Sequence, residues 1–248
     1  MKPLFILLFC LVVSSSAPYG NNSCTSKPQP WVHMVVSFQV NPMDGFQVAK
    51  KVPVSDLVKA PRHVVEHIAN SENIRRAVAG ALELGCKPSF LLAHDGIECA
   101  WGDSKLCQET NNPGNIKCTC NGTSKRARAF RAVHQRLADA GHPVCIRGFD
   151  KIEKSNHYYK VMKDNSQAWA EKIKILRKYN ALKKAKAGGY TNKGWCQALE
   201  NSPYSTDIYC AEKMWAVISQ FDLEAIDQAI EKNYCITTDD GNYALWLP

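Results

Sequence analysis

Cysteine content is the feature that most restricts how this chain folds. The 248 residues include 11 cysteines, and ten of them follow a segment, residues 1–17, that is typical of a secretory signal peptide. Lys2 gives this segment a positive start, residues 4–13 are mostly apolar, and residues 14–17 are small. Disulfides persist in oxidising compartments, so we expect a secreted, extracellular protein with up to five disulfides, whose pairing the sequence does not give.

A metal site is the alternative use of cysteines such as Cys118, Cys120 and Cys107, which lie close together. Zinc ligands usually come as two spaced pairs, which are absent here, so the pattern favours disulfides and we expect no metal or cofactor. Residues 63–67 match His-x-x-Glu-His, the inverted zinc-protease pattern. The further carboxylate of such sites is not evident, so we interpret this stretch as a helix with surface histidines.

The charge of the chain indicates what it binds. The formal net charge is +8, and cleavage after Ala17 removes one lysine and no acid, which leaves +7. A basic protein favours anionic partners such as wall polymers, glycans or membrane surfaces. No stretch is long enough to span a bilayer, so we expect no stable membrane insertion. We also expect a monomer that does not bind nucleic acid. Asn21 and Asn121 lie in glycosylation sequons.

The pattern of residues predicts three parts after the signal peptide. We expect an N-terminal extension at 18–58 with a strand at 31–40, a domain at 59–235 and a tail at 236–248. The expected elements of the domain, with their caps, are a helix at 71–84 capped by Ser71 and ended by Gly85, a cysteine-rich loop at 99–122, a helix at 123–141, an extended segment at 144–149, a long amphipathic helix from 165 or 166 to 187, and helices at 207–220 and 223–232, the last capped by Asp222.

Residues 88–100 read equally well as a buried strand or as a helix that begins at Pro88. Glu98 lies at the end of this apolar run, and Trp101 follows three residues later. A carboxyl group against apolar and aromatic surface is hard to ionise, so its pKa is expected to rise. Glycosidases use such a group as the general acid that protonates a leaving oxygen.

Residues 85–104 resemble the start of the catalytic domain of glycoside hydrolase family 73, whose signature is Glu-Ser-Gly-Trp-Gly-x-Ser. Glu98, Trp101, Gly102 and Ser104 match it. Three later segments resemble the family in the same order, and the likeness runs from about residue 60 to residue 230. These segments are Asn111–Lys117, Arg147–Asp150 followed by Tyr159 and Asn165, and Tyr204–Met214.

The resemblance implies an α+β fold that is mostly helical and lysozyme-like, with a small β lobe. It implies a helix at 88–100 and places a β-hairpin at 126–135, against the helical period found there. It also implies catalytic roles for Glu98, as the proton donor, and for Tyr204, which lies near the acid. The substrate-binding positions it suggests, some through holding loops, are Trp101, Asn112 and Asp207. Asp95 stands where the family prefers a small apolar residue, and we include it as a site residue, either as a substitute carboxylate or as a neighbouring charge that raises the pKa of Glu98.

The family often carries a second acid about a dozen residues before its Phe-Arg, and the matching residues 133–135 hold none. Asp95 as a substitute, assistance by the substrate's N-acetyl group, or a water held by His134, Gln135 or Tyr204 remain open. We expect a secreted β-N-acetylglucosaminidase that cleaves bacterial peptidoglycan. The alternatives are a catalytically impaired glycan- or wall-binding effector of the same fold, and membrane disruption by the helix at 166–187.

Overall fold

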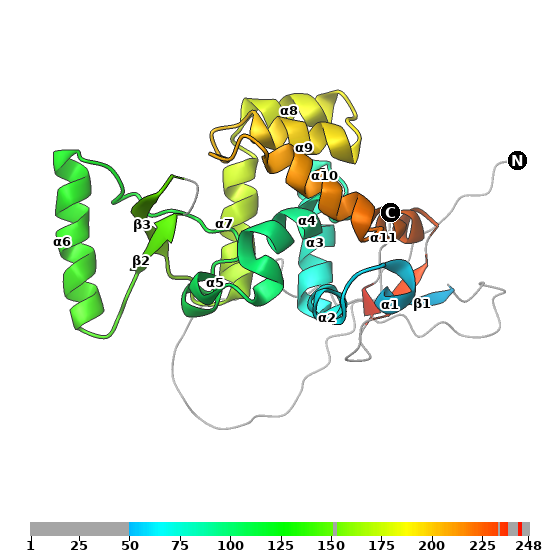
Figure 1. The fold of residues 1–248 in the computed structure, drawn as a ribbon, viewed down its shortest axis with the longest axis horizontal. Coiled ribbons are helices and arrows are strands. Elements are labelled where there is room, and N and C mark those ends of the chain that lie inside the picture. Colours follow the sequence, from blue (N-terminus) through cyan, green and yellow to red (C-terminus); the bar gives the residue numbers. More distant parts are fainter. Residues whose placement is uncertain (1–49, 151–152, 233, 238–242, 245–248) are drawn as a thin grey trace, which may run out of the picture. The chain divides into compact units, whose positions relative to one another are not determined.

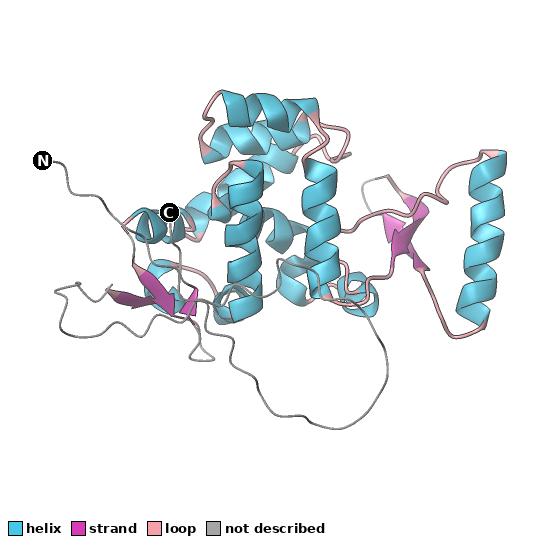
Figure 2. Ribbon diagram, turned by 180° about the vertical axis from the view of Figure 1, so that it is seen from behind, coloured by secondary structure: helices cyan, strands magenta, loops and turns pink. Residues whose placement is uncertain are grey.

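The computed structural model describes residues 50–150, 153–232, 234–237 and 243–244. The chain divides into two units, residues 1–47 and 48–248, and only the second contains described residues (Figure 1). The predicted signal peptide, the strand at 31–40 and the sequon at Asn21 therefore lie outside the described residues. The described part is mostly helical with two small sheets, which confirms the expected α+β class (Figure 2).

The described residues form the following helices and strands, in chain order. They are β1 Lys51–Pro53, α1 Val54–Leu57, α2 Arg62–Ala69, α3 Ser71–Leu84, α4 Pro88–Cys99, the 3₁₀ turn Ala100–Gly102, α5 Lys105–Thr110, α6 Lys125–Asp139, β2 Cys145–Asp150, β3 Ser155–Lys160, α7 Asn165–Leu176, α8 Asn180–Ala187, α9 Asn192–Glu200, α10 Cys210–Gln220, α11 Glu224–Glu231, β4 Cys235–Thr237 and β5 Tyr243–Ala244.

The helical body forms around α4, which packs against α3, α9, α10 and α11. Ten of its residues are buried, including Phe90 and Leu91, because apolar residues lie on every side of the helix. Pro88 occupies the first helical turn, where its missing N–H costs nothing. Residues 88–99 are therefore a buried helix, as the resemblance implied, and the alternative interpretation as a strand is wrong.

A three-stranded sheet closes one end of the helical body. Strand β1 pairs in parallel with β4, and β5 pairs with β4 in the antiparallel sense. Strand β1 lies before residue 59 and β5 after residue 235, the limits expected for the domain. The folded unit therefore takes in part of the predicted extension and part of the predicted tail.

The β lobe consists of the antiparallel hairpin β2–β3 and helix α6, and both views show α6 beside the hairpin, on the side away from the helical body (Figures 1 and 2). Ser124 caps α6 by accepting from the N–H of Ala127. Eight of the 15 residues of α6 are Ala or Arg, both good helix formers. The helical period predicted this element, whereas the hairpin that the resemblance placed at 126–135 is wrong.

The long helix expected up to residue 187 is broken, and this prediction is wrong in detail. Tyr179 adopts an extended conformation between α7 and α8. The break lets α8 bury Leu182 and Ala185 in the same core that receives Trp169 from α7. The cysteine-rich segment 99–122 likewise contains α5 and a 3₁₀ turn rather than loop alone.

Two predicted helix caps are also wrong. Asn70, rather than Ser71, caps α3 by accepting from the N–H of Glu72. Asp222 has a positive φ and forms an ion pair with Lys59, so α11 begins without a side-chain cap. Gly85 ends α3 in the left-handed conformation, as expected.

Among the described residues, one disulfide joins Cys118 to Cys145. The other described cysteines are thiols. None of the described helices has both the length and the apolar character that a bilayer crossing needs.

Candidate active site

Glu98 lies on the last turn of α4, where the buried helix reaches the surface. Its side chain is 25% exposed, whereas that of His94, one turn earlier, is fully buried. Ala100 then adopts a left-handed conformation and ends the helix. The rigid, buried part of α4 therefore carries a single partly exposed carboxylate at its end, which is the placement that a proton donor to an external substrate needs.

Asn115 holds the Glu98 carboxylate in position. Its amide Nδ2 donates to the backbone oxygen of Glu98 at 2.5 Å and to Glu98 Oε2 at 3.0 Å. Asn115 itself has a positive φ, which asparagine tolerates better than most residues. The sequence reasoning quoted the segment around Asn115 but did not single this residue out. The sequence feature that points to this residue is the run Asn-Asn-Pro-Gly-Asn at 111–115. The run does not show which of its three asparagines forms the contact.

Tyr204 fixes the same loop from the other side. Its hydroxyl donates to the backbone oxygen of Gly114 at 2.7 Å, and its ring packs edge-on against His94. Burial raises the pKa of Tyr204 well above its ordinary value, and the charge of Glu98 adds to the effect. Tyr204 is therefore a neutral phenol near Glu98, and its hydroxyl proton is already used in the hydrogen bond to Gly114.

His94 lies directly beneath the Glu98 carboxylate. Its Nε2 is 3.6 Å from Glu98 Oε1, too far for a good hydrogen bond. Neither ring nitrogen has a hydrogen-bond partner among the described residues. Burial, reinforced by the charge of Lys172, lowers the pKa of His94, so the imidazole is neutral at pH 7. Sequence reasoning did not assign His94 a role.

Asp95 points away from Glu98 into a buried ionic cluster. Asp95 Oδ2 is 3.0 Å from His67 Nε2, and Oδ1 is 3.5 Å from Lys172 Nζ. Burial raises the pKa of Asp95, but Lys172 and His67 outweigh it, and the pKa lies below its ordinary value. The partners of Asp95 thus come from α2 and α7. His63, the other histidine of the zinc-protease pattern, is exposed on α2.

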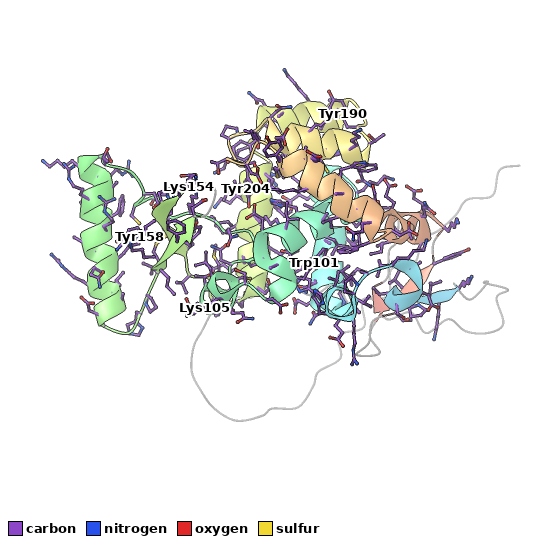
Figure 3. The ribbon with its side chains drawn as sticks, viewed as in Figure 1. Trp101, Lys105, Lys154, Tyr158, Tyr190 and Tyr204 are labelled. Atoms are coloured by element: carbon purple, nitrogen blue, oxygen red, sulfur yellow. A yellow bond between two sulfur atoms is a disulfide. The ribbon has the colours of Figure 1, made fainter. Side chains whose placement is uncertain are left out.

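The remaining predicted positions are not brought together with Glu98. The Trp101 ring packs against His67 and Phe221, and a Cβ on Gly96 would lie 2.3 Å from it. Gly96 and Glu98 are two residues apart and face opposite sides of α4. Trp101 is labelled with Tyr204 in Figure 3.

Asn112 and Asp207 hold loops in place. The fully buried Asn112 amide donates to the backbone oxygens of Ile116 and Lys160, each at 3.1 Å. It thereby ties the loop that carries Asn115 to strand β3. Asp207 accepts from the N–H of Tyr209 and forms an ion pair with Lys213 at the start of α10.

The hairpin presents a second set of charged groups on the face that carries Ile146, Gly148 and Asp150 from β2 and Ser155, His157 and Tyr159 from β3. Lys117 pairs with Tyr159 from the adjoining segment. Lys117 Nζ is 3.0 Å from Asp150 and 2.5 Å from Glu153, and His157 lies 2.6 Å from Glu153.

Tyr159 lies on this hairpin face, opposite Ile146, and is buried. Burial raises the pKa of Tyr159 to about 12, and the charge of Asp150 contributes in the same direction. The phenol is therefore protonated at neutral pH. His134 and Gln135, two of the suggested water-holding groups, lie instead on α6.

Several known proteins resemble the chain over this region. A peptidoglycan hydrolase from Sphingomonas sp. A1 is 21% identical, with 66% of this chain and 92% of that one covered at a TM-score of 0.47. The catalytic domain of the autolysin Auto from Listeria monocytogenes is 19% identical, with 68% and 90% covered at a TM-score of 0.45.

The sequence comparisons are more specific. The exo-glucosaminidase LytG of Bacillus subtilis (strain 168) is 28% identical over 142 residues, which is 57% of this chain and 46% of that protein. The chain thus spans somewhat less than half the length of that relative. Residues 75–223 match the family model of the mannosyl-glycoprotein endo-beta-N-acetylglucosaminidases. Because this match covers more than half of the chain, the chain belongs to the glucosaminidase family.

Proposed function

We propose that the protein is a β-N-acetylglucosaminidase that hydrolyses the glycan strand of bacterial peptidoglycan, with Glu98 as the general acid. One observation carries the proposal: a partly exposed carboxylate is held by Asn115 at the end of a buried helix, inside the segment that matches the family. Glu98 donates its proton to the glycosidic oxygen while positive charge develops at the anomeric carbon.

The neighbouring groups support this role by orienting Glu98. Asn115 fixes one carboxylate oxygen, and Tyr204 fixes the loop that carries Asn115. His94 places a neutral ring one helical turn before the carboxylate, so the imidazole itself adds no positive charge beside Glu98. Peptidoglycan is the substrate because the family acts on N-acetylglucosamine linkages and the chain carries a net charge of +8, which favours anionic walls.

A hairpin carboxylate is the group that we propose activates water. Residues 133–135, where the family places its second acid, lie on α6 and hold none. Asp150 and Glu153 are the carboxylates that pair with Lys117 at the hairpin, the part of the chain that follows α6. Lys117 lowers the pKa of Glu153, which keeps this carboxylate ionised as a general base requires.

The first experiment measures turbidity loss of purified cell walls and the fragments released from defined peptidoglycan by mass spectrometry. Glu98→Gln is expected to reduce turnover by about 100-fold or more, because general acids contribute roughly 10²–10⁴-fold. Glu109→Gln, an exposed glutamate on α5, is the matched control and should leave turnover unchanged. Equal clearing by wild type and Glu98→Gln would remove Glu98 from the mechanism, and the fragments identify the sugar at the new reducing end.

A wall-binding protein without turnover is the second candidate, and the absence of an acid at 133–135 favours it. Asp150→Asn and Glu153→Gln separate the two functions. Loss of turnover in one of them, with wall binding kept, supports the enzyme and identifies its base. Saturable wall binding by wild type with no fragment released supports the binding protein instead.

Secretion and a monomeric state are also part of the proposal. Residues 1–17 have the pattern of a signal peptide, which supports secretion. Amino-terminal sequencing of the protein recovered from culture medium tests cleavage after Ala17, and light scattering measures the mass of the particle. An intact amino terminus retained inside the cell would contradict secretion.

A further inference from the structure

The β lobe contains a cluster of three cysteines and one histidine that the proposed reaction does not use. The Sγ atoms of Cys118, Cys120 and Cys145 and a ring nitrogen of His134 all lie within 4.8 Å of one another. They come from three separate segments, namely the stretch before α6, α6 itself and the first residue of β2. The cluster thus joins α6 to β2 and to the stretch before α6.

The three cysteines of this cluster are buried, and His134 is partly buried. Cys120 is fully buried, and Cys118 and Cys145 are nearly so. The Nδ1 atom of His134 is buried and has no hydrogen-bond partner among the described residues. A buried polar nitrogen without a partner costs about 1–3 kcal/mol, so an arrangement that gives His134 a partner is favoured.

A disulfide cannot use all four groups. The bond between Cys118 and Cys145 leaves the Cys120 thiol and the His134 ring without a function. A tetrahedral zinc ion bound by three cysteines and one histidine uses each of them once. We propose that Cys118, Cys120, His134 and Cys145 form a structural zinc site in the reduced protein.

Conversion of the disulfide form into the zinc form requires a thiol or phosphine reductant. The sulfur–sulfur bond of Cys118 and Cys145 breaks when it takes two electrons and two protons from the reductant, which is oxidised. The three thiols then release three protons as three zinc–sulfur bonds and one zinc–nitrogen bond form. With four protein ligands the ion has no open position, so the site is structural rather than catalytic.

The surrounding charge suits this ion. Three thiolates around Zn²⁺ leave one net negative charge, and α6 is strongly basic. Arg131 reaches the cluster directly, because its guanidinium donates to the backbone oxygens of Cys120 and Gly122. A hollow of about 270 Å³ borders Cys118, His134 and Cys145 and gives an ion a path of entry.

The lobe also needs such an anchor. Ala127 is the only described residue of α6 that is fully buried, and the local core consists of the three cysteines with Phe130 and Tyr158 beside them. Figure 3 labels Tyr158 on the hairpin. A 15-residue helix with so little apolar contact is marginal in water, and a bound metal supplies the missing stabilisation.

A second group of this kind contrasts with the first. His67, Asp95 and Cys99 also lie close together, but the ammonium of Lys172 is 3.5 Å from Asp95. That fixed positive charge already occupies the place of a cation. At the sulfur cluster the nearby cation, Arg131, is instead engaged with the backbone oxygens of Cys120 and Gly122.

The experiment uses the full chain, purified with zinc and a phosphine reductant and without chelators. We expect one zinc per chain by elemental analysis. Cobalt substitution should give tetrahedral visible bands and a thiolate-to-cobalt charge-transfer band. Cys120→Ser and His134→Ala should lose the metal, although neither residue is needed for the disulfide.

His142→Ala, an exposed histidine of the same lobe, is the matched control and should keep the metal. His134→Cys should also keep it, because four thiolates bind zinc well, and this variant covers the case in which His134→Ala does not fold. A zinc-free reduced protein would overturn the proposal. So would zinc that survives both Cys120→Ser and His134→Ala.

Discussion

The helical body and the β lobe hold their functional groups by different means. In the body, α4 is surrounded by apolar side chains, and a buried ion pair between Asp95 and Lys172 lies on the same helix as Glu98. In the lobe, the hairpin face carries ion pairs around Lys117, and the local core is mostly sulfur. Apolar packing therefore fixes the helix that carries Glu98, whereas ion pairs and a disulfide hold the groups of the lobe.

The largest expected effect comes from replacing one phenylalanine by alanine in each region and comparing the two losses of stability. Phe90 is fully buried against His94 and Trp195, so Phe90→Ala should lower the free energy of unfolding by about 4 kcal/mol. Phe130 is half-buried on α6, so Phe130→Ala should cost about 1 kcal/mol. Urea unfolding measures both values, and equal losses would show that the two cores are alike.

The buried ion pair gives the next largest effect. Lys172→Met removes the cation beside Asp95 and leaves a buried carboxylate without its main partner, so unfolding should become easier by about 3 kcal/mol. Lys174→Met, on the same helix but exposed, should change it by less than about 0.5 kcal/mol. Thermal unfolding of the two variants at one pH gives the comparison. Similar values would mean that water reaches Asp95.

Gly96→Ala tests how tightly α4 is packed on the side away from Glu98. The added Cβ would lie 2.3 Å from the Trp101 ring, so the tryptophan has to move. Overpacking of this kind costs about 1–3 kcal/mol, and we expect about 2 kcal/mol in urea unfolding. Turnover should fall much less than in Glu98→Gln, because Trp101 contacts His67 and Phe221 rather than the acid. A loss as severe as that of Glu98→Gln would place Trp101 in the site.

The pH dependence of stability sharpens the comparison further. The pKa of His94 in the folded protein lies below its ordinary value of about 6.5. Below that pH, His94 is protonated in the unfolded chain before it is protonated in the folded chain, which favours unfolding. Stability is therefore complete above about pH 6.5 and falls by up to about 1.4 kcal/mol per pH unit as the pH decreases. Asp95, whose pKa is also lowered, acts in the same direction only below about pH 4.

His94→Gln is the variant that isolates this effect. Its unfolding temperature should depend less on pH between about 6.5 and 4 than that of wild type. His63→Gln, on exposed helix surface, should keep the wild-type dependence. An unchanged slope in His94→Gln would assign the acid sensitivity to other groups.

The sequence predicts the body better than the lobe, and the reason is physical. Apolar periodicity and end signals such as Gly85 specify α3 because tertiary packing agrees with local preference there. The break at Tyr179 was not predictable, since the stripe from Trp169 to Leu176 continues past it in sequence. In α6 the local helical pattern was the better guide than the family resemblance.

The candidate site shows the same limit. Glu98 was identified from its environment and from the matching motif. Asn115 and His94 were missed because their roles depend on contacts across the fold rather than on spacing. Asp95 was read as a neighbour of Glu98, and only the structure shows that Lys172, distant in sequence, draws it the other way.

The hydrogen bond from Tyr204 to Gly114 has a consequence for how the protein is made. It joins residues that are 90 positions apart, and it secures the loop that holds Glu98. During synthesis the chain therefore contains Glu98 long before Tyr204 can secure the loop beside it, and this contact forms only after α9 has been synthesised. Fragments that end before Tyr204 lack the contact and are expected to hold Glu98 less firmly.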